Sequence, residues 1–312
     1  MRMISYRGEA DYWRVRGFFR SARAAAGPAG GNWHVADFDY WRWHWLTNVV
    51  GRGPEDLLIW ETPAGEFAGV VLQGDPGVVH LRIHPEHRTP RLEESMIVAA
   101  ERRFATPVQD GERAVVIWTD ATDISRRAIL RERGYETYRS EHAKEHNYWV
   151  SLVEPIPEPQ LPPGYIVRSM GDVDELPARS LASWRAFHPD EPDEGCEASG
   201  DWYRNIQRAP LYRRDLDVVT VAPNGELASF SVCYFDDVSR TAVLVLAGTV
   251  RAYQRRGLGK AAVVEMLRRI RHVGGTEAYV SSYDPTAHAF YESAGFSDCV
   301  LAEAWRKVVA DS

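Results

Sequence analysis

The stretch Gln254-Arg255-Arg256-Gly257-Leu258-Gly259-Lys260 is a glycine-rich loop between a predicted strand and a predicted helix. The apolar run from Thr241 to Val250 precedes it, and a helical pattern continues to about His272. Such a loop can point several backbone N–H groups at one anion, and the helix dipole adds positive potential there. The two glycines let a phosphate approach the backbone closely, and three basic side chains add charge. The stretch therefore predicts a pyrophosphate-binding loop.

Two other glycine-loop patterns fit this stretch less well. A Walker A loop needs glycine where Gln254 stands and serine or threonine where Ala261 stands. The segment from Gly257 to Ala262 does match the dinucleotide pattern G-x-G-x-x-A, with Glu277 twenty positions after the first glycine. However, Glu277 would begin its strand, whereas a ribose-binding acid ends one, and too little chain follows for a doubly wound sheet.

The third pattern is [QR]-x-x-G-x-[GA] between a strand and a helix, and it resembles motif A of the GNAT superfamily of N-acetyltransferases. The resemblance implies that the loop binds the pyrophosphate of acetyl-coenzyme A. It also implies that the end of the preceding strand offers its backbone to the pantetheine arm and to the thioester carbonyl. The implied coenzyme-binding residues are Ala247, Gly248, Thr249, Val250, Gln254, Arg255, Arg256, Gly257, Leu258, Gly259 and Lys260.

A second motif lies between Ala287 and Phe296 and resembles the family's A-x-x-F-Y-x-x-x-G-F helix. By this resemblance Tyr291 is the general acid for the departing thiolate. Asp284 stands where the family often has an asparagine, and we assign it a coenzyme contact on that basis. Two structural alternatives remain open: Tyr291 as a core tyrosine with a satisfied hydroxyl, and Gly248 as a strand bulge.

The general base is not evident in the sequence. An ammonium with a pKa of ~10 must lose a proton before it can attack a thioester. The predicted strand from Thr241 to Val250 lacks the glutamate that many relatives carry there. A water relayed to a distant carboxylate is one alternative, and the other candidates are Asp236, Asp237, His188 and Glu226.

The composition is that of a globular protein. The chain has 312 residues, which is enough for two ordinary domains, with 45% hydrophobic and 26% charged residues. A net charge of −7 gives no global support for nucleic-acid binding. The three cysteines show no C-x-x-C spacing, and neither an apolar leader nor a membrane-length apolar run is present. We expect a cytoplasmic protein without a metal, a monomer or homodimer, that contacts neither nucleic acid nor membrane.

The chain reads as two related halves joined by a proline-rich spacer, EPIPEPQLPPG. The segment from Ile83 to Arg88 resembles the start of motif A, and an amphipathic helix follows at about 91–104. The segment from Ala128 to Tyr135 mirrors that from Ala289 to Phe296. We predict an α/β (α+β) fold of two tandem acyl-CoA N-acyltransferase (GNAT) domains, each a mixed, mostly antiparallel sheet flanked by helices. The predicted bounds are 1–153 for a degenerate first domain, 154–164 for the linker and 165–312 for the coenzyme-binding domain.

The first half departs from the motif at its loop. Arg91 and Glu93 stand in place of the two glycines, Pro90 removes a backbone donor, and Leu130 replaces the tyrosine. The carboxylate of Glu93 would repel a phosphate. We therefore expect the first half to have kept the fold and lost the coenzyme site, and either to cover the second domain or to shape the substrate cleft.

Two further patterns in the first half have structural and functional interpretations. In the run from Tyr40 to Trp45, Trp41 and Trp45 share a helical face and belong either to the core or to a ligand-stacking surface. His142 and His146 have a metal-ligand spacing but no evident third ligand, so we expect no metal site.

These patterns predict an N-acetyltransferase that acts on the primary amine of a small molecule. Its architecture resembles that of mycothiol synthases, tandem members with a degenerate first half. The alternative is a non-catalytic acyl-coenzyme A sensor or scaffold. The retained Tyr291 favours the enzyme, and the missing strand glutamate favours the sensor.

Overall fold

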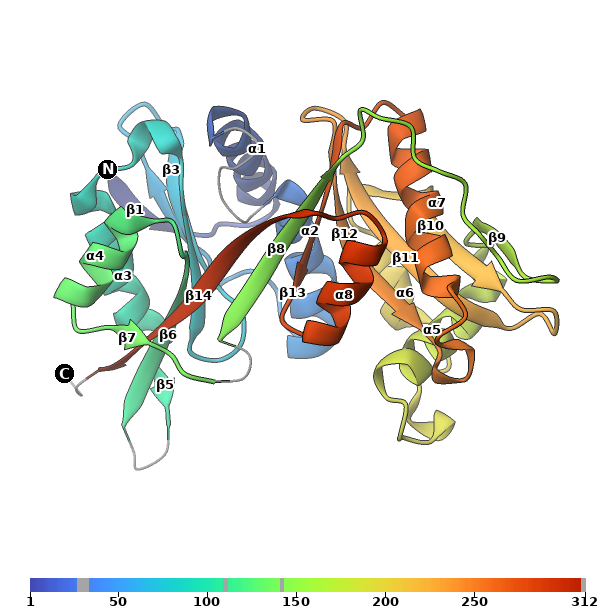
Figure 1. The fold of residues 1–312 in the computed structure, drawn as a ribbon. Helices are drawn as coiled ribbons and strands as arrows, with labels where there is room; N and C mark the ends of the chain where they lie inside the picture. The colour runs from blue at the N-terminus through green and yellow to red at the C-terminus, as the bar shows by residue number, and fades with distance from the viewer. Residues whose placement is uncertain (27–33, 109–111, 141–142, 310–312) are drawn as a thin grey trace.

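The computed structural model describes residues 1–26, 34–108, 112–140 and 143–309. Its strands form one continuous 14-stranded sheet that runs through both halves of the chain (Figure 1). Along the sheet the strands follow the order β1-β2-β3-β4-β6-β14-β8-β13-β12-β11-β10-β9, and the short β5 and β7 pair with β6 and β14. Helices flank this sheet, as the sequence predicted.

The first half contains two strands that are each followed by a helix, β4 by α3 and β6 by α4. Its strands are β1 (Arg2–Ser5), β2 (Leu58–Glu61), β3 (Phe67–Gln73), β4 (Val78–Ile83), β5 (Thr106–Pro107), β6 (Arg113–Asp120), β7 (Glu136–Thr137) and β8 (Lys144–Ser151). Its helices are α1 (Glu9–Ala26), α2 (Val35–Tyr40), the π-helix η1 (Trp41–Val50), the 3-10 turn η2 (Pro85–His87), α3 (Pro90–Phe104) and α4 (Ile124–Glu132).

The second half repeats this order after the spacer. Its strands are β9 (Ile166–Ser169), β10 (Tyr212–Val221), β11 (Leu227–Asp236), β12 (Thr241–Thr249), β13 (Glu277–Ser282) and β14 (Asp298–Val309). Its helices are α5 (Leu176–Phe187), α6 (Asp201–Gln207), α7 (Leu258–His272) and α8 (Pro285–Ser293), with 3-10 turns η4 (Val173–Glu175), η5 (Asp193–Gly195) and η6 (Arg251–Tyr253). The strand predicted from Thr241 to Val250 and the helix predicted to end at about His272 correspond to β12 and α7.

The internal repeat is visible in the pairing of parallel strands. In each half two parallel strands pair over a short stretch only: β4 with β6 at Val78 and Val79, and β12 with β13 from Thr241 to Val243. In each half the first of these strands leads to a helix, α3 or α7, and the second leads to α4 or α8. Each pair therefore diverges toward its carboxyl end, where a cleft can open between the strands.

The two halves exchange their last strands. β8, from the first half, pairs with β13 of the second half along Glu277–Ser282. β14, the last strand of the chain, pairs with β6 of the first half over Ala302–Val309 and with β8 over Asp298–Glu303. Figure 1 shows β14 crossing from α8 into the sheet of the first half. The two halves are thus held by shared backbone hydrogen bonds as well as by the spacer.

Side chains from α1, α2 and η1 join the halves on one side of the sheet. Arg20 of α1 forms an ion pair with Asp236 at 2.6 Å, and the ring of His34 lies 2.8 Å from Thr241 Oγ1. One buried apolar cluster contains Phe19 and Phe38 of the first half together with Phe230 and Tyr234 of the second. Burial of large apolar surface shared between the halves favours one rigid arrangement.

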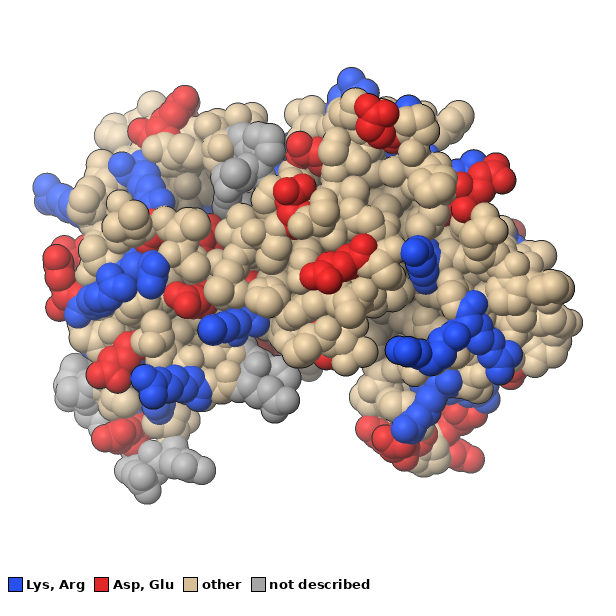
Figure 2. Space-filling view, viewed as in Figure 1, with Lys and Arg blue, Asp and Glu red and all other residues tan. Residues whose placement is uncertain are grey.

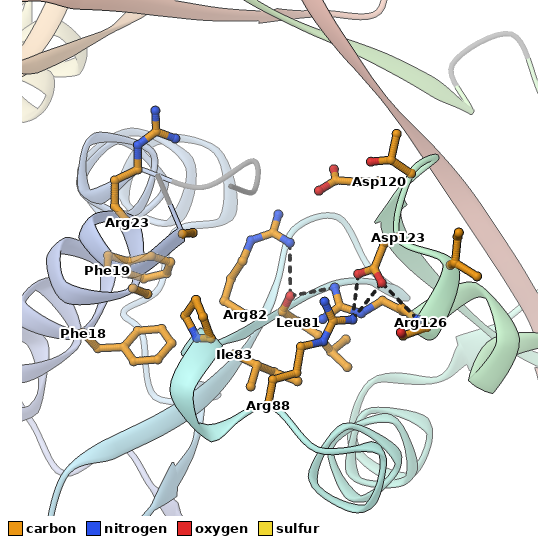
Figure 3. A pocket seen from close by; sticks show the side chains of 16 residues that line it. Phe18, Phe19, Arg23, Leu81, Arg82, Ile83, Arg88, Asp120, Asp123 and Arg126 are labelled. Carbon is orange, nitrogen blue, oxygen red and sulfur yellow. Dashed lines mark hydrogen bonds and ion pairs between the residues drawn. The ribbon is translucent and has the colours of Figure 1, made fainter. Parts of the chain in front are cut away.

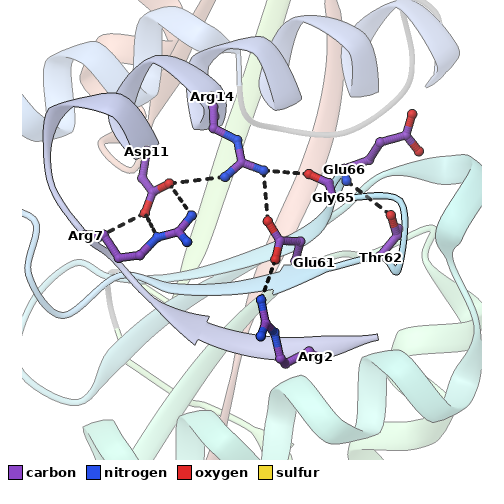
Figure 4. Close-up of polar contacts among 8 residues, drawn as sticks. All are labelled: Arg2, Arg7, Asp11, Arg14, Glu61, Thr62, Gly65 and Glu66. Carbon is purple, nitrogen blue, oxygen red and sulfur yellow. Dashed lines mark hydrogen bonds and ion pairs between the residues drawn. The ribbon is translucent and has the colours of Figure 1, made fainter.

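A charged network fastens the start of the chain to the sheet edge (Figure 4). Asp11 is buried and accepts hydrogen bonds from Arg7 and Arg14, which hold the pKa of its carboxyl below the usual value. Arg14 also contacts Glu61 of β2 at 3.0 Å, and Glu61 accepts from Arg2 of β1. This network orients α1 over the sheet. Among the described residues, no helix has the length and apolar character needed to cross a membrane.

Candidate functional site

The edge of β12 opens where this strand separates from β13. Pairing with β13 ends at Val243, so along the rest of β12, as far as the structure describes it, the backbone on this side has no strand partner. On its other side β12 pairs with β11, and the register shifts between Val232 and Cys233, so that Val245 is an extra, bulged residue. Unpaired backbone groups beside a bulge are a common way to present N–H and C=O groups to a ligand.

Gly248 lies in this open edge, but its lack of a side chain has a packing cause. A Cβ atom there would lie 2.4 Å from Cζ of Phe230 on the neighbouring strand. The bulge that we considered for Gly248 belongs instead to Val245. The glycine is thus required by Phe230, and it is compatible with a ligand along the opposite edge of the strand.

The glycine loop adopts the geometry that its sequence predicts. Gly257 is the N-cap of α7 with φ of 80°, a left-handed conformation that favours glycine, and no described neighbour lies within 4 Å of where its Cβ would be. At Gly259 a Cβ would lie 2.5 Å from Thr249 Oγ1 and 3.2 Å from Phe290. Gly257 therefore leaves open space above the helix N-terminus, whereas Gly259 brings that terminus against β12 and α8.

Positive charge gathers around this loop. Figure 2 shows Lys and Arg side chains together at the lower end of α7, which is its N-terminus. Within the described part of the chain, Arg255 and Lys260 have no ion-pair partner, and Arg256 donates to the phenol oxygen of Tyr165 at 2.8 Å. Gln254 donates to the carbonyl of Thr249 at 3.2 Å, which ties the loop to the end of β12. The helix dipole and the free cations together favour an anion here.

Two of the remaining members of the predicted coenzyme set, Val250 and Leu258, flank this loop in the chain. Leu258 is buried and anchors the first turn of α7, and the N–H of Val250 donates to Ala228 at 3.0 Å. Asp284 is the N-cap of α8, where its side chain accepts from the Thr286 N–H at 2.7 Å. The structure therefore brings the predicted residues of β12 and the loop together, while it gives Asp284 a capping contact of its own.

Tyr291 lies on α8 and packs with the apolar cluster between the sheet and α7. Its ring centroid is 5.2 Å from that of Phe290 and 5.9 Å from that of Phe296. Ala247 of the open β12 edge packs against the same cluster. Burial raises the pKa of Tyr291 to about 12, so its phenol is protonated at neutral pH. The structure supports both the packing interpretation and a phenol that can donate a proton near β12.

The candidate bases named from the sequence are all held by other contacts. Asp236 accepts from Ser239 and pairs with Arg20. His188 stacks on Trp184 and contacts Glu191 at 2.9 Å. The remaining two, Asp237 and Glu226, lie in exposed turns with Arg contacts. None of these four is among the described residues that line the cavity described next.

A cavity of about 890 Å³ lies between the two halves. It reaches β12 at Val243–Val245 and the end of β13 at Ser281–Asp284. Trp41 and Trp45 line it, and their indole N–H groups donate to the carbonyls of Gln73 and Gly74. The aromatic run thus contributes both to the core and to a cavity wall, because the π-helix keeps both rings on one side.

The histidine pair noted in the sequence falls partly outside the described residues, because His142 is not among them. The ring of His146 instead lies 3.1 Å from that of His288 on α8. Within the described ranges, no group of three or more His, Cys, Asp or Glu residues has an arrangement that could hold a metal ion.

The corresponding cleft of the first half is filled by its own charged side chains (Figure 3). Glu93 is 1% exposed and accepts hydrogen bonds from Arg88 at 3.0 Å and from Arg126. The carbonyl of Leu81, on the strand that corresponds to β12, accepts from both Arg82 and Arg126 at 3.1 Å. The carboxylate of Glu93 thus lies where the loop of the second half would hold an anion. The guanidinium groups of Arg82 and Arg126 occupy the edge of β4 that corresponds to the open edge of β12.

Other details of the first half fit the same pattern. Pro90 begins α3, Thr89 caps it, and Leu130 is fully buried where the second half has Tyr291. A cavity of about 470 Å³ remains beside Arg88 and α1, but the loop glycines and the tyrosine are absent from it. Only the second half therefore has the geometry for a nucleotide pyrophosphate among the two related clefts that the structure describes.

Comparison with known proteins agrees with this geometry. Residues 181–296 match the family model described as Acetyltransferase (GNAT) family. The matched segment lies in the second half of the chain and contains both the glycine loop and the Tyr291 helix.

Individual relatives define the architecture further. The chain is similar to mycothiol acetyltransferase of Segniliparus rotundus, with 24% identity over 263 residues, which is 79% of this chain and 92% of the relative. Among solved structures it resembles a tandem GNAT protein from the clavulanic acid biosynthesis pathway, with a TM-score of 0.67 at 14% identity, covering 100% of this chain and 99% of that one. It also resembles a GCN5-related N-acetyltransferase from Sphaerobacter thermophilus, with a TM-score of 0.64 at 18% identity, covering 99% and 96%. The predicted tandem GNAT fold is confirmed.

Proposed function

We propose that this protein is an N-acetyltransferase that moves an acetyl group from acetyl-coenzyme A to the primary amine of a small molecule. The observation that carries the proposal is the open edge of β12, which ends at a glycine loop with free cations and an accessible helix N-terminus. The match of residues 181–296 to the acetyltransferase family model supports acetyl transfer. At 24% identity, the mycothiol acetyltransferase relative does not define the acceptor.

The residues of the second half fit the two ends of the coenzyme. Backbone N–H groups around Gly257 and the charges of Arg255 and Lys260 would hold the pyrophosphate. The unpaired backbone from Leu244 to Thr249 would hold the pantetheine arm and polarise the acyl carbonyl, as preorganised donors do in acyl transfer. When bound, acetyl-coenzyme A supplies an activated thioester. The phenol of Tyr291 would then give a proton to the sulfur that leaves.

We also propose that the protein works on a small molecule in the cytoplasm, as a monomer or homodimer, without nucleic acid, membrane or metal. Cys196, Cys233 and Cys299 are all unpaired, which fits a reducing compartment. The net charge of −7 disfavours a nucleic-acid partner.

The test combines binding and turnover. Calorimetric titration with acetyl-coenzyme A measures affinity and stoichiometry, and a panel of primary amines with thiol release as readout measures transfer. Binding together with amine-dependent thiol release is the expected result. Binding without turnover by any amine would favour a sensor or scaffold, for which the lack of a glutamate on β12 is the argument. Absence of binding would refute both.

A further inference from the structure

The cavity between the halves adjoins the deep end of the proposed coenzyme site. It touches β12 at Val243–Val245, where this strand bulges and leaves β13. Its other walls come from α2, η1, β4, β6, β8 and β14, most of which belong to the first half. An acceptor in this cavity would therefore approach the open strand edge from the side opposite the glycine loop.

The charge of the cavity is negative. Four carboxylates line it, and its lining residues, within the described part of the chain, include no lysine or arginine. Burial lowers the pKa of His80 to about 3, so this histidine is neutral and does not offset the carboxylates. A wall of this kind attracts a cation and repels an anion. The four carboxylates are Asp37, Asp75, Glu145 and Asp284.

Two of these carboxylates are held from different elements of the first half. Asp37 lies on α2, where it accepts a hydrogen bond from the His34 N–H at 2.7 Å. Glu145 lies on the exchanged strand β8, beside β14, and accepts from the phenol of Tyr283. Each carboxylate raises the energy of the other when both are ionised, and the charge of Arg82 behind the cavity wall offsets part of this repulsion. The charge of a bound ammonium would relieve this repulsion.

The rest of the wall is aromatic. Trp41 and Trp45 have their N–H groups occupied by backbone carbonyls, so their rings present apolar surface. On the other side the rings of Trp118 and Tyr283 meet edge to face, with centroids 5.7 Å apart. Aromatic faces bind both apolar groups and cations. The cavity is thus suited to a ligand with a cationic amine on an apolar or aromatic body.

We propose that this cavity binds the acetyl acceptor as an ammonium ion on an apolar or aromatic body, and that Asp37 removes a proton from it. This inference rests on the function proposed above and supplies the general base that β12 lacks. Glu145 holds the ammonium through charge. The first half therefore contributes the acceptor site and the proton acceptor for chemistry carried by the second half.

The proton balance of the step is complete with the residues named. Asp37 takes one proton from the ammonium, and the amine nitrogen then forms a bond to the acyl carbon as the C–S bond breaks. Tyr291 gives its proton to the sulfur and regains one from the nitrogen through water. Asp37 releases its proton to solvent. The products are an amide, a free thiol and one proton.

The placement of these two groups suits the step. Tyr291 packs in the cluster on the α7 side of the sheet, whereas the neighbours of Asp37 on α2 pack in the cluster on the other side. Proton removal and proton delivery are thus separated by the plane of the sheet. Burial raises the pKa of Asp37 to about 7, with Glu145 acting in the same direction and Arg82 and Arg23 acting against it. A base with this pKa is half ionised near neutral pH.

The test uses the full chain and two probes of the same shape, phenethylamine and 2-phenylethanol. Calorimetry without acetyl-coenzyme A should show the ammonium binding at least ~10-fold more tightly than the neutral alcohol, and Glu145→Gln should reduce that preference. Equal affinity for both probes, or tighter binding of the alcohol, would overturn the acceptor site.

The Asp37→Asn variant tests the base. Asparagine keeps an acceptor for the His34 N–H, so the helix cap is preserved. At neutral pH, kcat with phenethylamine or a better amine should fall by ~10²-fold or more, as loss of a general base predicts. The wild-type inflection near pH 7 should disappear, and the variant should recover with rising pH as free amine increases. An unchanged pH profile would refute the role of Asp37.

A matched control separates this inference from the proposed function. Asp237→Asn removes the same charge from an exposed turn outside the cavity and should leave turnover unchanged. Acetyl-coenzyme A should bind all variants with wild-type affinity. If the wild type does not bind it, the proposed function fails. If binding and amine transfer persist while Asp37→Asn behaves like the control, only this inference fails.

Discussion

A methyl group added at Gly259 tests whether the loop must touch β12 for the coenzyme site to form. In Gly259→Ala, the new Cβ would lie 2.5 Å from Thr249 Oγ1 and 3.2 Å from the ring of Phe290. The first contact is shorter than real Cβ contacts by about 0.5 Å, since these stay above 3.0 Å. Helix α7 and β12 must therefore move apart, and the loop moves with the helix.

Two opposing terms set the effect on stability. Alanine in a helix is more favourable than glycine by ~1 kcal/mol, whereas overpacking of this kind costs ~1–3 kcal/mol. We expect a net destabilisation of ~0–2 kcal/mol, which leaves the protein folded. Affinity for acetyl-coenzyme A should fall further, by ~10-fold or more, because the displaced groups are the ones proposed to bind it; ~10-fold corresponds to ~1.4 kcal/mol.

The assays are urea denaturation and calorimetric titration, with two companion variants. Thr249→Ala combined with Gly259→Ala removes the 2.5 Å contact and should recover much of the affinity, giving a coupling energy of ~1–2 kcal/mol. Gly17→Ala is the matched control, since it lies in α1 with no described neighbour within 4 Å of its Cβ. It should stabilise the fold slightly and leave binding unchanged. Wild-type affinity in Gly259→Ala, together with a stability gain like that of the control, would refute the reasoning.

Four further predictions follow from the two halves and their charges. One acetyl-coenzyme A should bind per chain by calorimetry, because Glu93 fills the first cleft; two equivalent sites would contradict this. Gly257→Glu should abolish binding in a folded protein, since its side chain enters the space above the helix N-terminus and repels phosphate; retained affinity would rule out the cradle. Tyr291→Phe should lower kcat by ~10²-fold or more with binding intact, and full activity would make Tyr291 a packing residue only. Burial raises the pKa of Asp37 from 3.8 to about 7, so the folded protein loses stability from this group as pH rises from 4 through 7. Asp37→Asn does not carry this loss. The difference in unfolding free energy between variant and wild type, measured by urea denaturation, should therefore favour the variant more at pH 8 than at pH 4.

The exchange of strands between the halves was beyond the reach of sequence patterns. Strand β14 runs from Asp298 to Val309 and pairs with strands of both halves. Strand pairing is a long-range property, and an apolar strand can satisfy its backbone against any neighbour with a matching register. A duplicated sequence offers two equivalent partners, so only the packing of the whole chain decides between them.

Single residues show the same difference between what a local sequence pattern predicts and what the packing of the whole chain decides. The sequence offered Gly248 as a coenzyme contact or a strand bulge, but the structure shows that the side chain of Phe230 leaves no room for a Cβ atom there. The sequence offered four candidate bases, which were Asp236, Asp237, His188 and Glu226. The carboxylates that line the cavity are different ones, namely Asp37, Asp75, Glu145 and Asp284. Asp37 and Glu145 carry no local motif, because their significance arises from elements that are far apart in the chain.

By itself the sequence determined the internal repeat, the fold class and the loop. Glycine spacing, helical periodicity and the run around Tyr291 are local, and local patterns specify local backbone geometry and the charges at a helix N-terminus. Only the tertiary structure decided that the first cleft is closed by Glu93, that the halves share strands, and that a negatively charged aromatic cavity lies beside Val245. These features depend on which distant side chains meet and how far they lose contact with water. Such contacts form only when the whole chain has packed.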